Sequence, residues 1–195
     1  ENTIAVHVVN QQPSSRWYSG SGIYRDVKLS VTDKVHVAKY GTTITSPKLE
    51  EQKNVAVDTL VKSRIVNQDD QAHSIYAEYE IVDQSGQVVS EKVRSEVQSV
   101  LAGQEINLSH TLHVEKPTLW DVKTNNPALY TLYTRVYRDS QLVDVQKERF
   151  GYRYLNWTPE GGFFLNGVAT KFHGVSLHHD HGALGAEENY KACDL

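Results

Sequence analysis

The feature that most constrains the fold of this chain is a two-residue alternation of apolar and polar side chains. It recurs at residues 27–31, 35–37, 75–81, 106–114 and 130–136. Because successive side chains of a strand point to opposite faces, each segment predicts a strand with one buried and one solvated face. Turn-forming runs at residues 83–86, 102–104 and 138–140 separate these segments. This spacing is typical of an antiparallel β-sandwich, so we expect an all-β, immunoglobulin-like domain over residues 32–152.

Composition narrows the class of protein. The only cysteine is Cys193, which excludes an internal disulfide and is more simply an inert thiol than a nucleophile, so the core must rest on packing. The net charge of -4 comes from interspersed charges, which form no basic stripe for nucleic acid. No apolar run approaches the roughly eighteen residues of a transmembrane segment. The composition fits a cytoplasmic and a secreted or cell-surface protein alike, and an oligomer as well as a monomer.

The first thirty residues predict a different domain. Residues 2–10 and the segment that follows residue 25 each have the pattern of a strand, with a loop bearing proline and serine between them. Two strands cannot bury a core alone, so we expect residues 1–31 to be the last strands of another sheet. The chain contains no methionine and does not begin with a leader sequence. We therefore expect it to be an internal part of a longer polypeptide.

The C-terminal region combines a hairpin with a cluster of histidines. Residues 163–169 contain Asn166-Gly167 between apolar arms, which predicts a tight β-hairpin. We expect the second arm to continue to Val175, and four of the nine histidines lie within residues 173–181, at the end of this arm and just beyond it. In (β/α)₈ barrels, sites are built at such strand ends, but a barrel needs roughly 250 residues. Residues 153–195 can therefore hold only its opening strand, and residues 186–195 have the composition of a helix.

Six groups of residues, taken in order, resemble the signature of glycoside hydrolase family 2, which includes β-galactosidases, β-glucuronidases and β-mannosidases. The groups are Asn2-Thr-Ile-Ala-Val; Arg16-Trp-Tyr with Gly20 and Gly22-Ile-Tyr-Arg-Asp-Val; Leu119-Trp with Pro127, Leu129 and Tyr130; Phe150-Gly with Arg153; Gly162-Phe with Leu165-Asn-Gly; and Lys171 with Gly174-Val and His178-His-Asp-His. Together they cover nearly the whole chain.

The resemblance implies three domains in order: the end of a jelly-roll sugar-binding domain, an immunoglobulin-like sandwich and the first hairpin and strand of a TIM barrel. It also implies retaining hydrolysis of a β-glycoside, most simply a β-galactoside, by two glutamates. Neither catalytic residue is expected in this chain, because Glu187 and Glu188 lie outside the family's catalytic motifs, so the chain alone should be inactive. No cofactor is expected within it, and a divalent cation in the complete enzyme stays open. The expected partners are the glycan substrate and the rest of the same polypeptide.

The resemblance assigns substrate-binding roles to four residues. His181 and His178 match positions where the family's histidines contact sugar hydroxyls, a task that suits an imidazole with one donor and one acceptor. Asp180 could orient an imidazole or bind a hydroxyl, and Arg16 lies on a loop expected to reach toward the barrel mouth. Structural roles for these residues stay open, because Ser176-Leu177 stands where the family often has Asn-Arg.

Other interpretations compete for the same residues. The histidine run has the residue types of a zinc site, but neighbouring side chains on a strand point to opposite faces, so we expect no metal there. His173 is expected to pack within the strand. Arg25 and Arg153 are expected to tie neighbouring domains together, and Trp17, Trp120 and Tyr130 to serve packing. As an alternative function, an adhesion or carbohydrate-binding module would need an exposed aromatic strip, for which Tyr76 and residues 133–137 are the candidates.

Overall fold

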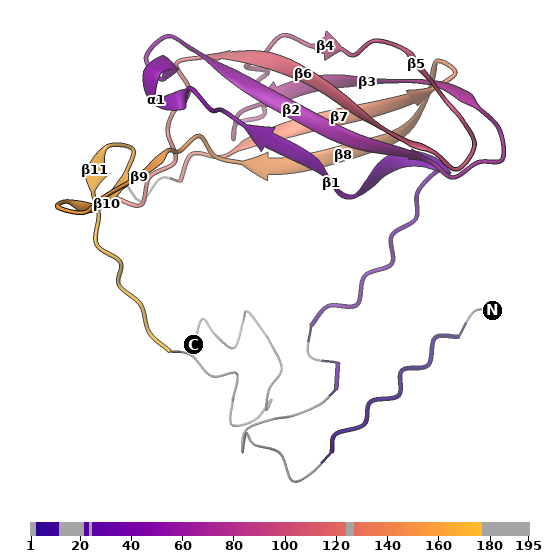
Figure 1. Ribbon diagram of the computed structural model, residues 1–195, viewed down its shortest axis with the longest axis horizontal. Coiled ribbons are helices and arrows are strands. Elements are labelled where there is room, and N and C mark those ends of the chain that lie inside the picture. Colours follow the sequence, from indigo (N-terminus) through magenta and orange to yellow (C-terminus); the bar gives the residue numbers. More distant parts are fainter. Residues whose placement is uncertain (1–2, 12–21, 24, 124–126, 177–195) are drawn as a thin grey trace. The chain divides into compact units, whose positions relative to one another are not determined.

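A computed structural model describes residues 3–11, 22–23, 25–123 and 127–176 of the chain (Figure 1). The chain divides into two compact units, one of Glu1–Ser30 with Phe172–Leu195 and one of Val31–Lys171. Every helix and strand of the described residues belongs to the second unit. That unit is all-β except for one helical turn, α1 (Leu49–Gln52), which the sequence did not predict. The all-β class is therefore confirmed.

Two antiparallel sheets in the second unit form an immunoglobulin-like sandwich (Figure 1). The first has the order β1-β2-β6, from β1 (Val35–Thr45), β2 (Ala56–Asn67) and β6 (Glu105–Glu115). The second has the order β4-β3-β7-β8, and β5 also pairs with β3. Its strands are β3 (His73–Val82), β4 (Val93–Arg94), β5 (Gln98–Val100), β7 (Tyr130–Arg138) and β8 (Gln141–Phe150). Four of the segments predicted from alternation, at residues 35–37, 75–81, 106–114 and 130–136, are therefore strands.

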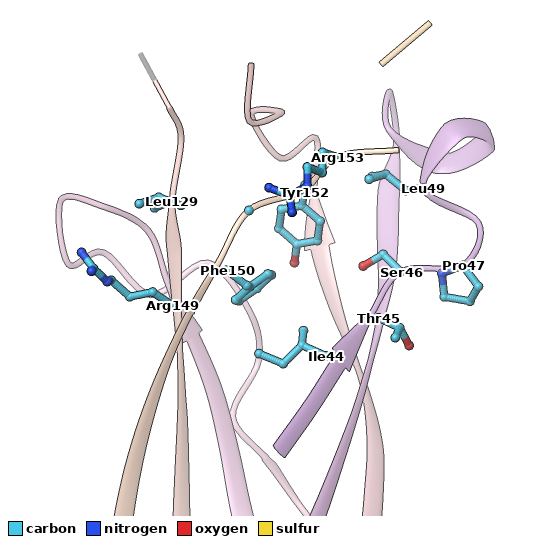
Figure 2. A pocket seen from close by; sticks show the side chains of 11 residues that line it. Ile44, Thr45, Ser46, Pro47, Leu49, Leu129, Arg149, Phe150, Tyr152 and Arg153 are labelled. Carbon is cyan, nitrogen blue, oxygen red and sulfur yellow. The ribbon is translucent and has the colours of Figure 1, made fainter. Parts of the chain in front are cut away.

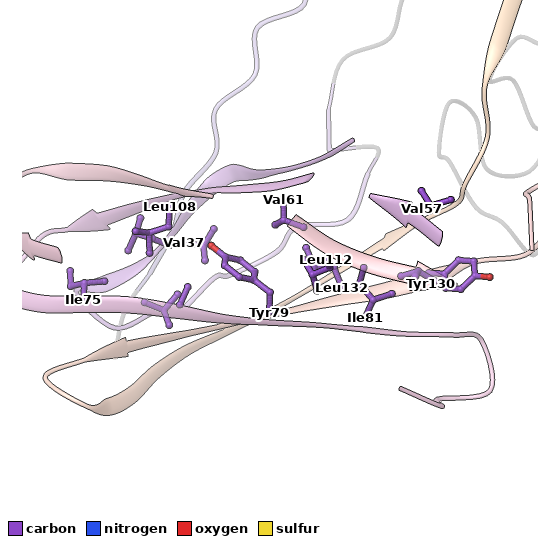
Figure 3. Packing of buried hydrophobic residues seen from close by; sticks show 14 of the residues in the cluster. Val37, Val57, Val61, Ile75, Tyr79, Ile81, Leu108, Leu112, Tyr130 and Leu132 are labelled. Carbon is purple, nitrogen blue, oxygen red and sulfur yellow. The ribbon is translucent and has the colours of Figure 1, made fainter. Parts of the chain in front are cut away.

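The core lies between the inner faces of the two sheets, where alternate side chains meet (Figure 3). Val61 and Ile65 of β2 share it with Ile75 and Tyr79 of β3 and Leu132 of β7, and all five are fully buried. Burying an aliphatic side chain of this kind contributes about 1.5–3 kcal/mol to stability. Packing of this apolar layer holds the two sheets together.

The predicted turns are confirmed and have the backbone conformations that their residues favour. The carboxylate of Asp83 accepts two backbone N–H groups of its own turn, and Gly86 there has a φ of 85°. Gly103 closes the turn before β6 with a φ of 70°. Between β7 and β8, Asp139 and Ser140 have φ values of 49° and 68°, the paired left-handed residues of a type I′ hairpin turn.

A bulge interrupts β1 at the edge of the first sheet. Its pairing with β2 shifts between Val37 and Thr42, and Tyr40 at the bulge has a φ of 55° and is 92% exposed. Gly41 makes this geometry feasible, since a Cβ there would lie 2.6 Å from the carbonyl oxygen of Ala38. Such a bulge protects an edge strand from pairing with other chains.

A small antiparallel sheet follows the sandwich, with the order β11-β10-β9. Its strands are β9 (Leu155–Thr158), β10 (Gly162–Leu165) and β11 (Val168–Ala169). Asn166 and Gly167 join β10 to β11 with φ values of 52° and 79°. The predicted Asn-Gly hairpin is therefore confirmed, whereas β9 was not predicted.

The described part of the N-terminal region contains no strand, and its assignment to a sheet completed by other parts of the polypeptide stays a prediction. Residues 3–11 and 25–31 carry no strand, and Val27, Leu29 and Val31 are 78%, 86% and 85% exposed. Alternation supplies a strand with two faces, but a strand forms only where a neighbour accepts and donates its backbone hydrogen bonds. No described segment pairs with these residues.

Candidate functional site

The four residues predicted to bind substrate, Arg16, His178, Asp180 and His181, lie outside the described residues. The same holds for Trp17, Cys193 and the predicted helix at residues 186–195. The structure describes residues 153–176, which lead toward the histidine run. It also describes the sandwich, to which the first residues of this segment are attached. The described part of the candidate site is therefore the structure that supports the histidine run.

The second arm of the hairpin is shorter than predicted. β11 ends at Ala169, and residues 171–176 are not a strand. The reason is the length of its partner, because β10 begins at Gly162, whose φ of 72° turns the chain away. The last bond of the arm runs from the N–H of Thr170 to the carbonyl of Phe163 at 2.9 Å. His173 is consequently exposed, and its predicted packing within a strand is wrong.

Asn166 fixes the hairpin to the sandwich. Its backbone N–H donates to the carbonyl of Tyr154 at 3.0 Å, and its side-chain carbonyl accepts from the N–H of Tyr154 at 3.1 Å. Its amide nitrogen donates to the carbonyl of Trp120 at 2.9 Å. One side chain thus shapes the turn and crosses to the loop before β7. The next residue inward, Leu165, is buried at 5% exposure.

Trp120 joins the same junction from the sandwich side. Its N–H donates to the carbonyl of Tyr152 at 2.8 Å, and the guanidinium of Arg153 lies 4.9 Å from the centre of its indole ring. Gly151 packs beneath the tryptophan, since a Cβ there would lie 2.9 Å from the Cβ of Trp120. Trp120 is half-buried and Tyr130 buried. The described contact of Arg153 is therefore with an aromatic ring, a cation–π contact.

An open hollow of about 710 Å³ lies beside this junction, between the end of β1 and the end of β8 (Figure 2). The rings of Phe150 and Tyr152 lie at its centre, while the guanidinium of Arg149 points to one side. The hydroxyls of Tyr152 and Thr59 are 2.8 Å apart, and burial raises the pKa of Tyr152 well above its usual range. None of the described residues that line the hollow is a carboxylate or a histidine. The described lining therefore lacks the two kinds of side chain that most often act as general acids or bases.

The opposite end of the sandwich carries a chain of charges around His73, the first residue of β3. Its Nδ1 lies 2.7 Å from Asp139 Oδ2, and its Nε2 lies 3.0 Å from Asp69 Oδ2. Lys34, just before β1, donates to the other oxygen of Asp69 at 2.8 Å. A carboxylate only accepts, so both ring nitrogens must donate and the ring must carry a positive charge. The hydrogen bonds that the ring donates to Asp139 and then to Asp69 raise the pKa of His73.

This cluster has the residue types of a metal site but not the arrangement, because each ring nitrogen is directed at a different carboxylate. Among the described residues, no group of three or more His, Cys, Asp or Glu side chains could hold a metal ion. The cluster instead ties three connections together, namely the entry to β1, the β2–β3 turn and the β7–β8 turn. Sequence reasoning missed it, since its members are 35 and 66 residues apart in the chain.

The outer face of the second sheet holds the tyrosines considered as a binding strip. Tyr76 is only 8% exposed. Its ring stacks on Tyr137 with centroids 4.7 Å apart, and the guanidinium of Arg94 lies 3.6 Å from its centre. The hydroxyl of Tyr137 donates to Glu78 at 3.0 Å. These rings are engaged within the sheet and do not offer an open platform for a sugar.

Comparison with known proteins then identifies the family. The model of glycosyl hydrolases family 2 matches residues 27–153, which span the sandwich and the junction at Trp120 and Gly151. The chain belongs to this family.

This family 2 chain is similar to longer proteins. It is 39% identical over 194 residues to the β-galactosidase BoGH2A of Bacteroides ovatus, covering 99% of this chain and 22% of that protein. It is 29% identical to a β-glucuronidase of Bacteroides fragilis, covering 84% of this chain and 23% of the relative. A crystal structure of a family 2 member from Bacteroides cellulosilyticus superposes with a TM-score of 0.79 at 31% identity, over 91% of this chain and 23% of that one.

The family 2 chain thus spans about a fifth of the length of these relatives. Their matched portion includes the sandwich, so the predicted immunoglobulin-like fold is confirmed by both structure and comparison. In the described residues, no helix is long and apolar enough to cross a membrane. Sequence patterns did not predict the contacts of the junction or those of the charged cluster.

Proposed function

We propose that the complete polypeptide is a retaining β-glycosidase that hydrolyses terminal β-galactosides. The observation that carries this proposal is the 39% identity to a β-galactosidase over 99% of the chain, within a family of glycosyl hydrolases. The competing substrate is a β-glucuronide, favoured by the similarity to the β-glucuronidase of Bacteroides fragilis at 29% identity. Identity favours the galactoside, and kinetics must decide between the two.

In this proposal the chain supplies three consecutive parts of the enzyme. Residues 1–31 belong to a jelly-roll sugar-binding domain, residues 32–152 are the spacer sandwich, and residues 153–195 open the catalytic barrel. His181 and His178 bind hydroxyls of the reacting sugar, Asp180 orients an imidazole or binds a hydroxyl, and Arg16 approaches from the first domain. The hairpin anchored by Asn166 supports this, because the chain leading to the histidine run starts from a fixed point on the sandwich.

The bonds are broken by residues that this chain does not supply. Retaining hydrolysis needs an acid/base and a nucleophile with carboxyl groups about 5–5.5 Å apart. We place both glutamates in a later part of the polypeptide. The role of this chain is then to hold and orient the sugar while those carboxyls act, and the chain alone should be inactive.

The test compares kcat/KM of the complete polypeptide for nitrophenyl β-galactoside and nitrophenyl β-glucuronide. We expect the galactoside to be preferred by about 10²-fold or more, because a site built for neutral hydroxyls leaves the carboxylate of the glucuronide desolvated and without a partner. The reverse preference would overturn the galactosidase assignment, and turnover of neither would overturn the glycosidase. Turnover by the 195-residue chain, free of host enzyme, would contradict the placement of the glutamates.

The sugar-binding role is tested by His181→Ala in the complete polypeptide. A hydrogen bond that strengthens toward the transition state is worth about 1.5–3 kcal/mol, so kcat/KM should fall about 10-fold to 10²-fold while the melting temperature changes little. The control is His113→Ala, an exposed histidine of β6 bonded to Asp58 at 2.7 Å. If loss of activity follows loss of folding in His181→Ala, the residue is structural.

A further inference from the structure

The outer face of the second sheet carries a surplus of positive charge. Residues directly opposite each other in antiparallel strands project to the same face, as do residues two apart in one strand. By these relations the outward positions of β4, β7 and β8 include four cations. Lys92, just before β4, joins them through its ion pair with Glu78 on β3. We call this surface the cationic face, and its members are Lys92, Arg94, Arg135, Lys147 and Arg149.

Two carboxylates at outward positions of β3 neutralise only part of this charge. Glu78 accepts from Lys92 at 2.7 Å, and Glu80 accepts from Arg135 at 3.1 Å. The other three cations of the face are exposed and form no ion pair with any described residue, namely Arg94, Lys147 and Arg149. The whole chain has a net charge of -4, so these cations concentrate positive charge against its overall sign. The cationic face therefore has a local positive potential.

Tyrosine rings restrain the cations of this face. The guanidinium of Arg94 lies 3.6 Å from the ring centre of Tyr76. The charged groups of Arg135 and Lys147 lie 5.2 and 5.1 Å from the ring centre of Tyr133. A cation–π contact of this kind orders a long side chain but leaves its N–H donors available to an anion. Because the side chains are ordered beforehand, binding an anion costs little further conformational entropy.

The composition of the cationic face favours a polyanion over an apolar partner. The core of a protein interface is enriched in apolar and aromatic side chains. At the outward positions of these described strands, the exposed apolar side chains are Leu142 and Val145. Three strand spacings separate β4 from β8, so the face is about 14 Å wide. That width fits a polymer with repeated charges better than a single small anion.

We propose that the cationic face is a non-catalytic binding surface for an acidic polysaccharide whose sugars bear carboxylate groups. The inference rests on the proposed function in one respect, that the complete polypeptide acts on glycans. Planar guanidinium groups bind carboxylates with two parallel hydrogen bonds. The half-buried ring of Tyr133, close to two cations, offers an apolar surface to a sugar ring. The face thus holds an acidic glycan without using the residues predicted to contact the sugar that is cleaved.

Affinity measurements on the complete polypeptide test the proposal. The probes are polygalacturonate, neutral dextran and the acidic polypeptide poly-glutamate. Polygalacturonate has α-linkages, so it is not a substrate of a β-glycosidase. We expect it to bind about tenfold or more tightly than either of the other probes at low salt, and more weakly as salt screens the charges. Absence of binding would overturn the proposal. Equal affinity for poly-glutamate would indicate an acidic protein partner and would overturn it as well.

A matched pair of double variants locates the site. Arg94→Gln with Lys147→Gln should weaken polygalacturonate binding about fivefold or more, because it removes two unpaired cations from the face. Lys39→Gln with Lys62→Gln removes the same charge from exposed positions of β1 and β2, and should weaken binding about twofold or less. Equal losses in the two variants would show only a general attraction between charges and would contradict the proposed site.

Two further measurements on the same variants separate this inference from the others. The melting temperature should be nearly unchanged in both, because the substituted side chains are exposed. Hydrolysis of nitrophenyl β-galactoside should also be unchanged, since neither variant alters a residue predicted to contact the cleaved sugar. Binding is measured without turnover, so a failure of the glycosidase assignment remains distinguishable from a failure of the cationic face to bind.

Discussion

The two ends of the sandwich are stabilised by different kinds of interaction. At the hairpin end, Tyr152 and Trp120 pack around Gly151, and the hydrogen bonds of Asn166 join neutral groups. At the opposite end, Asp69 and His73 join connections through charges. Contacts between neutral groups do not depend on protonation, whereas the charged cluster exists only while its members keep their charges. The end that leads toward the predicted sugar site is therefore the one that pH and salt disturb least.

The charged end is sensitive because of its geometry. His73 has side-chain exposure of only 12%, and its two carboxylate partners leave no stable arrangement for a neutral ring. Its pKa is raised, and those of Asp69 and Asp139 are lowered by their hydrogen bonds, to Lys34 first for Asp69 and to the backbone of Ser74 first for Asp139. The comparison between the two ends can be tested by variants at each of them.

The largest effect is expected at the hairpin end from Tyr152→Ala. Removing a fully buried aromatic side chain leaves a cavity and removes the hydrogen bond between Tyr152 and Thr59, so the free energy of unfolding should fall by about 3–5 kcal/mol. Urea unfolding measures it. Leu142→Ala, at a position 46% exposed on β8, is the control and should change stability by about 0.5 kcal/mol or less. Equal effects would show that packing does not dominate this end.

A smaller loss of stability is expected when the hydrogen bonds of Asn166, which tether the hairpin to the sandwich, are removed. Asn166→Gly keeps the left-handed turn but removes both side-chain hydrogen bonds, for a loss of about 1–2 kcal/mol. The loss should be local, so amide hydrogen exchange should speed up in β9, β10 and β11 while the core strands stay protected. Uniform acceleration across the sandwich would instead mean that the hairpin and sandwich unfold as one unit.

The third prediction concerns pH at the charged end. The folded pKa of His73 lies above its unfolded value of 6.5, so its contribution is complete below pH 6.5 and is lost as pH rises through the folded pKa. Asp69 and Asp139 have lowered pKa values, so their contribution is present above 3.8 and is lost as pH falls through the folded values. The melting temperature should therefore decline on the alkaline side of pH 6.5.

His73→Gln should flatten this alkaline decline, because glutamine does not titrate. Tyr152→Phe, at the other end, should lower the melting temperature by a constant amount and keep the wild-type slope in this range. Melting curves between pH 5 and about 9 measure both slopes. A wild-type slope retained in His73→Gln would assign the pH dependence to other groups.

The smallest effect is expected from the exposed ion pair between Lys34 and Asp69. The lysine side chain is 62% exposed, so its attraction to the carboxylate is largely screened. Lys34→Gln should lower the melting temperature by about 2 °C or less at low salt and by less still in 1 M salt. A large loss that persists in high salt would mean that Lys34 acts through packing.

Whether a strand could be predicted depends on how regularly its apolar and polar residues alternate. β3 places apolar residues at every second position, and β7 does so except at Thr134, so their alternation identified them directly. β2 has buried Thr59 and Ser63 among its inward residues and outward Leu60 and Val66, which blurs the pattern. All four residues of β9 are exposed, so only its pairing with β10 makes it a strand.

At the candidate site, too, local patterns could be predicted from the sequence but long-range contacts could not. The Asn-Gly pair was enough to predict the hairpin turn, since few other residues accept left-handed backbone angles. The tether from Asn166 to Trp120 spans 46 residues and leaves no local pattern. The sugar-binding roles of His178, Asp180, His181 and Arg16 stay predictions, drawn from the family resemblance.

By itself, the sequence determined the all-β class, the inward and outward faces of the main strands and the turns, because these depend on side-chain period and local backbone preference. Tertiary structure alone decided which extended segments became strands. Among the described residues, 27–31 and 171–175 carry apolar side chains but form no strand, while residues 155–158 pair with β10 and form β9. Strand pairing is a relation between distant segments. The charged state of His73 likewise depends on the fold, which brings Asp139, 66 residues away in the chain, to the same ring as the nearby Asp69.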